Sequence, residues 1–154
     1  MVTKKDTIKV LEFKVTDDML NQHNLLHGGE LFKMMDTVAG YISEEFGGKR
    51  SLTKAVNNFT FVSPTYNGET VRVKGIMDYA GRTSMEIFMR ATIPERDNIE
   101  VAHGYFTMVA VDDNLKSMEI QNLKLETLED EKYYNQALER RKIYKEIDKL
   151  KEKF

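Results

Sequence analysis

The sequence predicts an α+β fold in which a five-stranded antiparallel sheet wraps around one long helix. Three observations lead to this prediction: one oily helical segment, five segments that alternate apolar and polar residues, and short turns between the last four of them. The helical segment spans residues 28–46, and apolar side chains cover well over half of its circumference. Such a helix must be covered on most sides. Short connections favour antiparallel pairing, so a curled sheet around the helix satisfies all three observations.

Each element follows from its residue pattern. Residues 8–15 alternate apolar and polar, and a slip at Val10-Leu11 suggests a bulge. The helix of residues 28–46 starts at a glycine pair and ends at Gly47-Gly48, where glycine commonly closes a helix. Turn-forming residues separate the later strands. These four strands are predicted at residues 52–62, 70–79, 83–92 and 101–111.

Strand order and turn length together describe a hotdog fold, in which the sheet is wrapped around the central helix. The alternation is clearest in residues 70–79, where the two faces of the strand separate by residue type. We expect one face to hold Val71, Val73, Met77 and Tyr79, and the other to hold Thr70, Arg72, Lys74 and Asp78.

The pattern changes after residue 114, which divides the chain into a hotdog domain of residues 1–114 and a mostly helical extension of residues 115–154. Thr127 with an acidic residue three positions later is typical of a helix N-cap, and a charged helix is predicted from there to the C-terminus. One apolar seam is expected to pack on its own domain or on a neighbouring subunit; a coiled coil with another partner is the alternative. The seam is formed by Ile143, Ile147, Leu150 and Phe154.

Composition excludes several classes of function. A chain of 154 residues suits one domain with a substantial core, and its formal net charge of −2 lacks the basic surface of a nucleic-acid-binding protein. The absence of cysteine removes disulfides, thiolate metal sites and cysteine nucleophiles. No apolar run is long enough for a membrane span, and the N-terminal residues do not resemble a signal peptide. We therefore expect a cytoplasmic protein that binds neither nucleic acid nor membranes.

Three kinds of catalytic group occur close together around the start of the long helix. Asn21 supplies a side-chain amide that can orient water, and Asp36 lies at the margin of the apolar surface, where a carboxylate can act as a base. Gly28 and Gly29 leave backbone N–H groups open at the positive end of the helix dipole, where an oxyanion is stabilised. A boundary aspartate that faces only solvent remains the alternative for Asp36.

Other polar residues suggest less specific sites. His23 and His27 have metal-ligand spacing, but the adjacent glycines place them in a loop or cap without a third ligand, so no metal site is expected. Asn57 interrupts the predicted inward face of its strand, where it can satisfy the core or contact a ligand. The turn Arg82-Thr83-Ser84 offers donors to an anionic ligand, although a solvated turn explains it equally well.

Several separated motifs in register resemble the hotdog acyl-CoA thioesterases, in particular the bacterial acyl-CoA hydrolases related to brain acyl-CoA hydrolase. The resemblance covers about residues 8–140. The motifs are Asn21-x-His23-Asn24-x-Leu-x-Gly28-Gly29, Met35-Asp36-x-Val-Ala-Gly40, Gly81-Arg82-Thr-Ser-Met-Glu86 and Phe106-Thr-Met-Val-Ala-Val111.

The resemblance implies hydrolysis of acyl-CoA to a free acid and coenzyme A, with no cofactor beyond the coenzyme A of substrate and product. It implies that Asn21 and Asp36 from different subunits form the catalytic pair, and that the Gly28 and Gly29 amides polarise the thioester carbonyl. Arg82, Thr83 and Ser84 would lie near coenzyme A. It also implies a dimer, with three dimers forming a hexamer.

Two candidate site residues depart from the family pattern. His27 stands where many relatives have an aromatic residue, and Asn57 stands where they usually have an acid, so both positions bear on acyl preference. Two other functions use the same fold. A non-catalytic acyl-CoA sensor usually carries a helix-turn-helix, for which the few residues before the first strand leave no room, and a hydratase or dehydratase needs a histidine paired with an acid, for which His27 is the nearby candidate.

Overall fold

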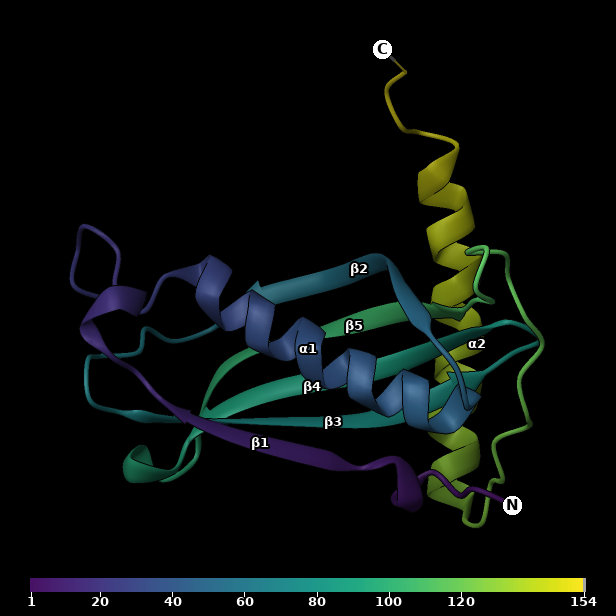
Figure 1. Ribbon diagram of the computed structural model, residues 1–154, viewed down its shortest axis with the longest axis horizontal. Coiled ribbons are helices and arrows are strands. Elements are labelled where there is room, and N and C mark those ends of the chain that lie inside the picture. The colour runs from purple at the N-terminus through teal and green to yellow at the C-terminus, as the bar shows by residue number, and fades with distance from the viewer. Residues whose placement is uncertain (154) are drawn as a thin grey trace.

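The computed structural model describes residues 1–153 and contains one five-stranded antiparallel sheet with a long helix on each face (Figure 1). The strand order is β1-β3-β4-β5-β2, so β1 and β2 are the edges. This arrangement confirms the predicted α+β hotdog fold. The elements are η1 (Lys5–Thr7), β1 (Lys9–Lys14), η2 (Asp17–Met19), α1 (Gly28–Gly47), β2 (Ser51–Phe61), β3 (Thr70–Ala80), β4 (Ser84–Ile93), η3 (Pro94–Arg96), β5 (Ile99–Ala110) and α2 (Leu128–Asp148).

Helix α1 is the central helix that the sheet curls around. It ends at Gly47, and the C-cap residue Gly48 has a φ of 72°, the left-handed conformation that glycine adopts without strain. Its sheet-facing side is buried, whereas Tyr41 is 56 % exposed on the opposite side and a Cβ added at Gly40 would meet no atom. The buried residues of the helix are Leu31, Met35, Val38, Ala39, Ile42, Ser43 and Phe46.

The predicted bulge in the first strand is wrong. Strand β1 pairs with β3 without any shift of register, and its burial alternates regularly. Leu11 and Phe13 pack against the core, while Val10 faces solvent. The apparent slip in the sequence therefore comes from one exposed valine and not from an extra residue.

Strand β3 contains a bulge that the sequence did not predict. The register with β4 shifts between Met77 and Tyr79, so the simple alternation ends there. Tyr79 packs against Tyr134 of α2, with ring centroids 5.1 Å apart, and not against the core around α1. The expectation that Tyr79 shares a face with Met77 is therefore wrong. Asp78 does lie on the face opposite Met77, near Arg140 of α2, and it is buried there.

The segment after β5 runs along one end of the sheet and back toward the N-terminus. The N–H of Met118 donates to the Ala110 carbonyl, and the N–H of Lys124 donates to the Val2 carbonyl. Helix α2 then begins at the predicted N-cap, because Thr127 Oγ1 accepts a hydrogen bond from the Asp130 N–H at 3.0 Å. The second helix thus covers the face of the sheet opposite α1.

Helix α2 differs from the prediction at its C-terminal end. It stops at Asp148 and does not continue to the C-terminus, because its last turns extend beyond the sheet and short unsupported helices are marginal in water. Its own domain covers the predicted seam only in part: Ile143 is 55 % exposed, and Ile147, which borders a groove with β2, is 51 % exposed. Ala137 is the one buried residue of the helix, and Phe154 lies outside the described residues. No helix of residues 1–153 is both long and apolar enough to cross a lipid bilayer.

Candidate active site

Helix α1 places Asp36 beside the edge strand β2. The helix runs antiparallel to the strand, with Gly28 next to Phe61 at one end and Ser43 hydrogen-bonded to Ser51 at the other. Midway between them, Thr53 Oγ1 donates a hydrogen bond of 2.7 Å to Asp36 Oδ1. The carboxylate is half-buried. One oxygen is thus fixed by the strand, which orients the carboxylate at the edge of the sheet.

Sequence reasoning did not identify Thr53. A polar residue in an alternating strand resembles any solvent-facing position, and 17 residues separate Thr53 from Asp36 along the chain. Only the antiparallel alignment of α1 with β2 reveals the pairing.

The loop before α1 fixes Asn21. Its Oδ1 accepts hydrogen bonds from the backbone N–H groups of His23, at 2.8 Å, and of Leu25, at 3.3 Å. This arrangement is typical of asparagine at a turn. The side-chain oxygen is therefore occupied, and the Nδ2 group is the part of the amide that can donate to a ligand.

Asn21 and Gly28 line the same hollow, which has a volume of about 320 Å³. Its walls are mainly apolar and include Phe61 of β2 and Val101 of β5. Gly28 matters here because a Cβ at this position would lie 3.1 Å from the Phe61 ring. The structure therefore brings together two of the predicted groups, the asparagine amide and the first glycine of the helix.

The second glycine has a different environment from the one predicted. The Gly29 N–H donates to His27 Nδ1 at 2.9 Å, so the histidine side chain is the N-cap of α1. The expectation of an open N–H at Gly29 is wrong for this conformation, because an imidazole nitrogen can cap a helix as an oxygen does. Among residues 1–153, no group of three His, Cys, Asp or Glu side chains is placed to hold a metal ion.

Asp36 lies apart from this hollow in the single chain. It is two turns along α1 from Gly28, which corresponds to roughly 12 Å at 1.5 Å per residue. It is not among the residues that line the hollow around Asn21. The base and the amide are therefore not combined into one site by a single chain.

The other predicted binding residues lie elsewhere. The turn at Arg82, Thr83 and Ser84 is at the opposite end of the sheet from Gly28, where the Ala110 N–H donates to the Thr83 carbonyl. The Arg82 side chain is 77 % exposed and lies 3.6 Å from Glu119. In one chain, this turn does not meet the hollow.

The prediction that Asn57 faces inward is wrong. Its partner across the strands is Tyr105, whose ring lies under the Arg140 guanidinium of α2 at 4.0 Å from the ring centroid. Directly opposed residues share a face, so Asn57 points away from α1 and lines a groove with Tyr144 of α2. A register shift between Asn57 and Thr60 accounts for the error, because it interrupts the alternation of the strand.

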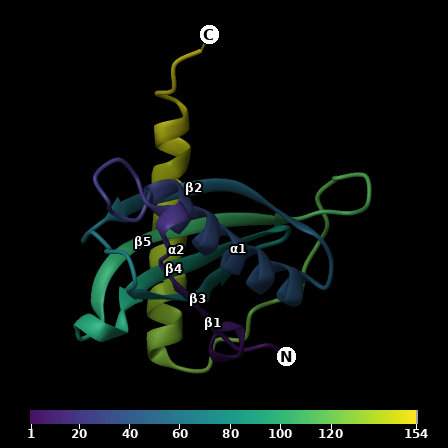
Figure 2. The ribbon, with the colours of Figure 1, turned by 60° about the vertical axis from the view of Figure 1, so that its left-hand side comes forward.

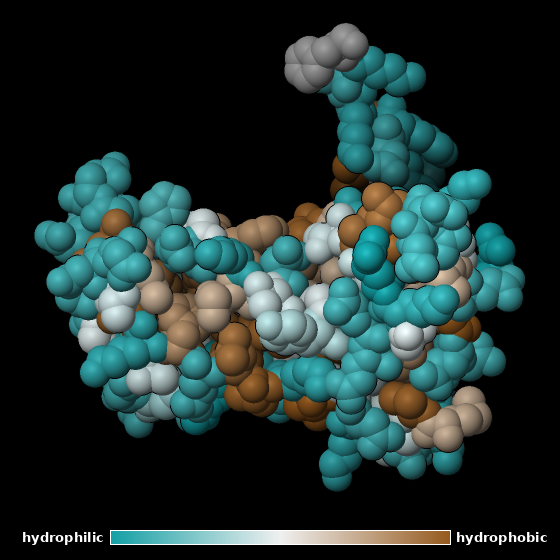
Figure 3. Space-filling view, in the orientation of Figure 1, coloured by the Kyte–Doolittle hydropathy of each residue, from teal (hydrophilic) through white to brown (hydrophobic). Residues whose placement is uncertain are grey.

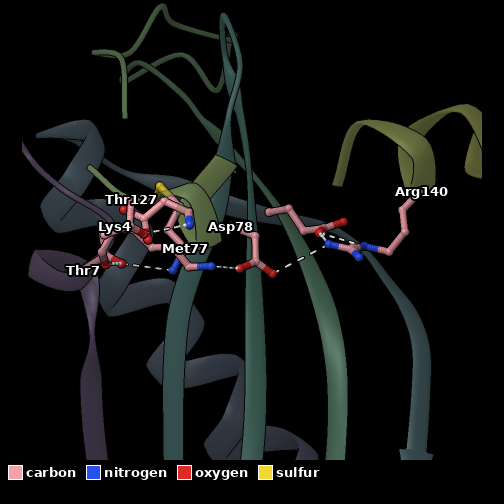
Figure 4. A network of polar contacts seen from close by, with 8 residues as sticks. Lys4, Thr7, Met77, Asp78, Thr127 and Arg140 are labelled. Carbon is pink, nitrogen blue, oxygen red and sulfur yellow. Dashed lines mark hydrogen bonds and ion pairs between the residues drawn. The ribbon is translucent and has the colours of Figure 1, made fainter. Parts of the chain in front are cut away.

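A second cluster of polar groups lies on the α2 side of the sheet (Figure 4). Asp78 Oδ1 forms an ion pair with Lys4 Nζ at 2.9 Å, and Asp78 Oδ2 lies 3.6 Å from Arg140 Nη2. Arg140 also contacts Glu86 through two nitrogens, at 2.5 and 3.0 Å, and the Tyr144 hydroxyl donates to the other Glu86 oxygen. Both carboxylates are almost fully buried. The cluster therefore fastens α2 and the N-terminal segment to the sheet.

Burial has a measurable consequence for these carboxyl groups. It raises the pKa of Glu86, because the loss of hydration outweighs the hydrogen bond and the charge of Arg140. It also raises the pKa of Asp78 against the opposing effects of Lys4 and Arg140. A carboxyl with a raised pKa binds protons more readily in the folded than in the unfolded protein.

The sign of the resulting pH dependence follows from linkage. The free energy of unfolding should rise as the pH falls from neutral toward about 4.5, the ordinary pKa of a glutamic acid, and the gain should be lost as the pH rises through the folded pKa. We expect the wild type to gain stability relative to Glu86→Gln on acidification. Urea unfolding of both proteins over a pH series measures this difference, and a wild type that loses stability relative to the variant would contradict it.

Comparison with known proteins identifies the family. Residues 23–99 match the family described as the thioesterase superfamily. The chain belongs to this superfamily. The matched segment includes α1, β2, β3 and β4 and therefore the Asp36–Thr53 pair.

Curated relatives of this thioesterase-superfamily chain include Protein VdlD of Helicobacter pylori, which is 29 % identical over 144 residues, or 92 % of this chain and 82 % of the relative. The acyl-CoA thioester hydrolase YkhA of Bacillus subtilis, whose name marks it as uncharacterised, is 25 % identical over 78 % of this chain and 72 % of its own length. The mouse cytosolic acyl coenzyme A thioester hydrolase is 28 % identical over 75 % of this chain, which corresponds to 32 % of the mouse protein.

Solved structures show the same fold. An apo hexameric acyl-CoA thioesterase superposes with a TM-score of 0.90 at 21 % identity, over 97 % of each chain. The acyl-CoA hydrolase of Staphylococcus aureus, solved with butyryl coenzyme A and coenzyme A, has a TM-score of 0.83 at 24 % identity, over 96 % of this chain and 94 % of its own. At these identities the agreement establishes the fold of the thioesterase-superfamily chain.

Proposed function

We propose that this protein hydrolyses acyl-CoA thioesters to a free acid and coenzyme A. The observation that carries the proposal is the Asp36 carboxylate, oriented by Thr53 at an unpaired edge strand, in a chain of the thioesterase superfamily. The names of curated relatives describe acyl-CoA thioester hydrolases, which supports acyl-CoA as the substrate class. The name of the mouse relative describes a cytosolic enzyme, and we propose the same location here.

The proposed site forms between two copies of the chain. Strand β2 is an 11-residue edge of the sheet, and long unpaired edges are natural sites for strand addition. Apolar side chains along it are exposed in the single chain, including Leu52 at 43 % and Phe61 at 57 %. Tyr41 on the uncovered side of α1 extends this surface. Antiparallel pairing of β2 with β2 of a second copy would bury the exposed edge.

Twofold symmetry then unites the separated catalytic groups. Antiparallel pairing about the middle of β2 sets the Thr53 end of one strand beside the Phe61 end of the other. Asp36 accompanies Thr53, and Asn21 and Gly28 accompany Phe61. Each Asp36 would therefore face the partner's Asn21 and the partner's Gly28, and one dimer would hold two sites.

The reaction follows from these groups. Asp36 accepts a proton from water, and the water oxygen bonds to the acyl carbon of the thioester. The carbonyl oxygen becomes an oxyanion that the Gly28 N–H stabilises, while the Asn21 Nδ2 group orients the water or the carbonyl. The C–S bond then breaks, and the coenzyme A sulfur receives the proton from Asp36. Direct attack by the Asp36 carboxylate, through an anhydride that water later opens, uses the same geometry.

Solved variants of a structural neighbour support these roles. In the Staphylococcus aureus acyl-CoA hydrolase, single asparagine, aspartate and threonine residues have been replaced by alanine. These three residues occur in the same order and at the same separations as Asn21, Asp36 and Thr53 do here. The match supports the asparagine and the aspartate, and it adds the threonine to the site.

The remaining predicted residues receive different roles in the proposal. Arg82 is exposed beside the half-buried Thr83 and Ser84, and its guanidinium, which lies 3.6 Å from Glu119, could turn to the phosphates of coenzyme A held by a neighbouring subunit. His27 caps α1 beside the hollow and would border the acyl group. Asn57 lies on the other face of the sheet, so the proposed site does not include it. No cofactor is proposed, and hexameric neighbours support a trimer of dimers.

Release of free thiol from a panel of acyl-CoA esters tests the proposal. The chain has no cysteine, so a thiol reagent reports coenzyme A alone. We expect turnover that depends on acyl length. Binding of the esters without thiol release would indicate a sensor, and hydration of an unsaturated acyl-CoA would indicate a hydratase; either result would overturn the proposal.

Replacing Thr53 by alanine should lower kcat by about tenfold, the effect of losing one hydrogen bond to a charged group worth about 1.5 kcal/mol. The reason is that Asp36 loses the group that orients its Oδ1. Thr53→Ser keeps the hydroxyl and should retain most of the activity. Steady-state kinetics of both variants measure the effect, and equal kcat values for the alanine variant and the wild type would show that Thr53 does not position the base.

A further inference from the structure

Helix α2 crosses the outer face of the sheet and extends past the β2 edge (Figures 1 and 2). Its contacts follow this path. Tyr134 packs on Tyr79 of β3, and Arg140 binds Glu86 of β4. Tyr144 borders a groove with Asn57 of β2. Residues 141–148 of the helix therefore pass over the middle of β2.

The part of α2 that passes over β2 carries two apolar side chains that the rest of the chain covers only in part. Ile143 and Ile147, here called the overhang pair, are both more than half exposed and lie one turn apart on the same side of the helix. The residues around them are charged, and Figure 3 shows this end of the molecule as largely hydrophilic with an apolar patch where it leaves the body. Two isoleucines at this spacing on a charged helix are typical of a helix–helix contact.

The position of the overhang pair indicates that a second copy of the chain covers it. The groove beneath this part of α2 is lined by Ala55 and Asn57, at the middle of β2 (Ser51–Phe61). In the proposed pairing, the twofold axis lies between the two β2 strands, beside the middle of each, so it also passes beside this part of α2. The overhang pair is therefore continuous with the proposed dimer interface.

We propose that the two α2 helices of a dimer pack antiparallel against each other across this axis, on the outer face of the joined sheet. In this arrangement Ile143 of one copy contacts the partner's Ile147, and the reverse contact is identical by symmetry. The inference rests on the β2 pairing of the proposed function. It assigns to the second helix the role of a clamp that holds the two halves of each catalytic site together.

In this arrangement, the buried ion cluster of Arg140, Glu86 and Asp78 orients α2 for the contact with the partner helix. Arg140 lies one turn before Ile143 and is fixed by Glu86 and Asp78, so the cluster sets the direction in which the overhang pair points. A contact between the two helices can hold the two sheets in register only if each helix is rigidly attached to its own sheet.

Cysteine pairing tests the inference, because the natural chain contains no cysteine. In the variant Ile143→Cys with Ile147→Cys, mild oxidation should convert most of the protein to a covalent dimer on a non-reducing gel. The matched control, Lys142→Cys with Glu146→Cys, has the same spacing on another side of the helix and should remain mostly uncross-linked. Disulfides form only when the Cα atoms come within about 7 Å.

A second variant tests the contact between the two α2 helices without a disulfide. Ile143→Glu with Ile147→Glu should raise the dimer Kd at least tenfold in sedimentation, with an unchanged far-UV circular dichroism spectrum. A wild type that does not dimerise would overturn the β2 pairing and the clamp together. Dimers that hydrolyse acyl-CoA but do not cross-link through the overhang pair would overturn the clamp alone. A ladder of larger covalent species would place the contact between dimers and would also overturn it.

Discussion

The variant Asp36→Ala is expected to have a kcat about 10²–10⁴-fold lower than the wild type, because a general base usually contributes a factor of this size. The half-buried carboxylate is held by Thr53 and is the one acidic group that the proposed dimer places opposite the partner's Asn21. Its removal leaves water with no group to accept a proton, while binding of the acyl chain and of coenzyme A is unaffected. The loss should therefore appear in kcat and not in KM.

Thiol release over a range of acyl-CoA concentrations measures this effect. Glu44→Ala is the matched control, because Glu44 is an exposed acid on the same helix that lies two turns from Asp36. The control should keep wild-type turnover. Near wild-type kcat in a folded, dimeric Asp36→Ala variant would show that Asp36 is not the base.

Mixing two inactive variants tests whether the site is shared between subunits. A dimer of the Asp36→Ala variant lacks the base in both of its sites, and a dimer of the Asn21→Ala variant lacks the amide in both. After unfolding and refolding together, half of the dimers are mixed, and each mixed dimer has one intact site. About a quarter of wild-type activity should return if each site takes one residue from each subunit. No recovery in a mixture shown to exchange subunits would indicate that both residues act within one chain.

The variant Arg140→Ala should lower the free energy of unfolding by about 3–5 kcal/mol, the typical effect of removing one partner from a buried ion pair. Arg140 is the cation that Glu86 and Asp78 share, and those side chains are only 2 % and 6 % exposed. Without it, Glu86 is left with the Tyr144 hydroxyl and no positive charge. The guanidinium also lies over the Tyr105 ring, so packing is lost as well.

Urea unfolding measures this change. Lys142→Ala is the control, because Lys142 is largely exposed, contacts only Glu139 on the same helix and should cost less than about 1 kcal/mol. The double variant Arg140→Met with Glu86→Gln removes both charges and should recover part of the loss. If Arg140→Ala were as stable as the control, the cluster would not hold α2 on the sheet.

Most of the fold follows from local sequence patterns. Alternation places all five strands within two residues of their observed bounds, and the glycines at residues 28 and 48 mark the limits of α1. The N-cap at Thr127 is likewise a local signal. These features depend on neighbours within a few residues, which is why a linear pattern contains them.

The errors occur where distant segments decide the outcome. The bulge after Met77 directs Tyr79 to α2, and the shifted register of β2 directs Asn57 away from α1. Neither shift in register leaves a signal in the residue composition of its strand. Glu86 did leave a signal, because a charged residue between Met85 and Ile87 interrupts an apolar run, and such a position calls for a buried partner.

By itself, the sequence determined the elements of this protein, the wrapped helix and the nature of the groups around α1, because periodicity and glycine placement are local properties of the chain. The tertiary structure alone decided that Thr53 orients Asp36 and that Asn21 lies apart from Asp36 within one chain. These relations depend on how α1 aligns with β2, and that alignment is set by the packing of the whole core.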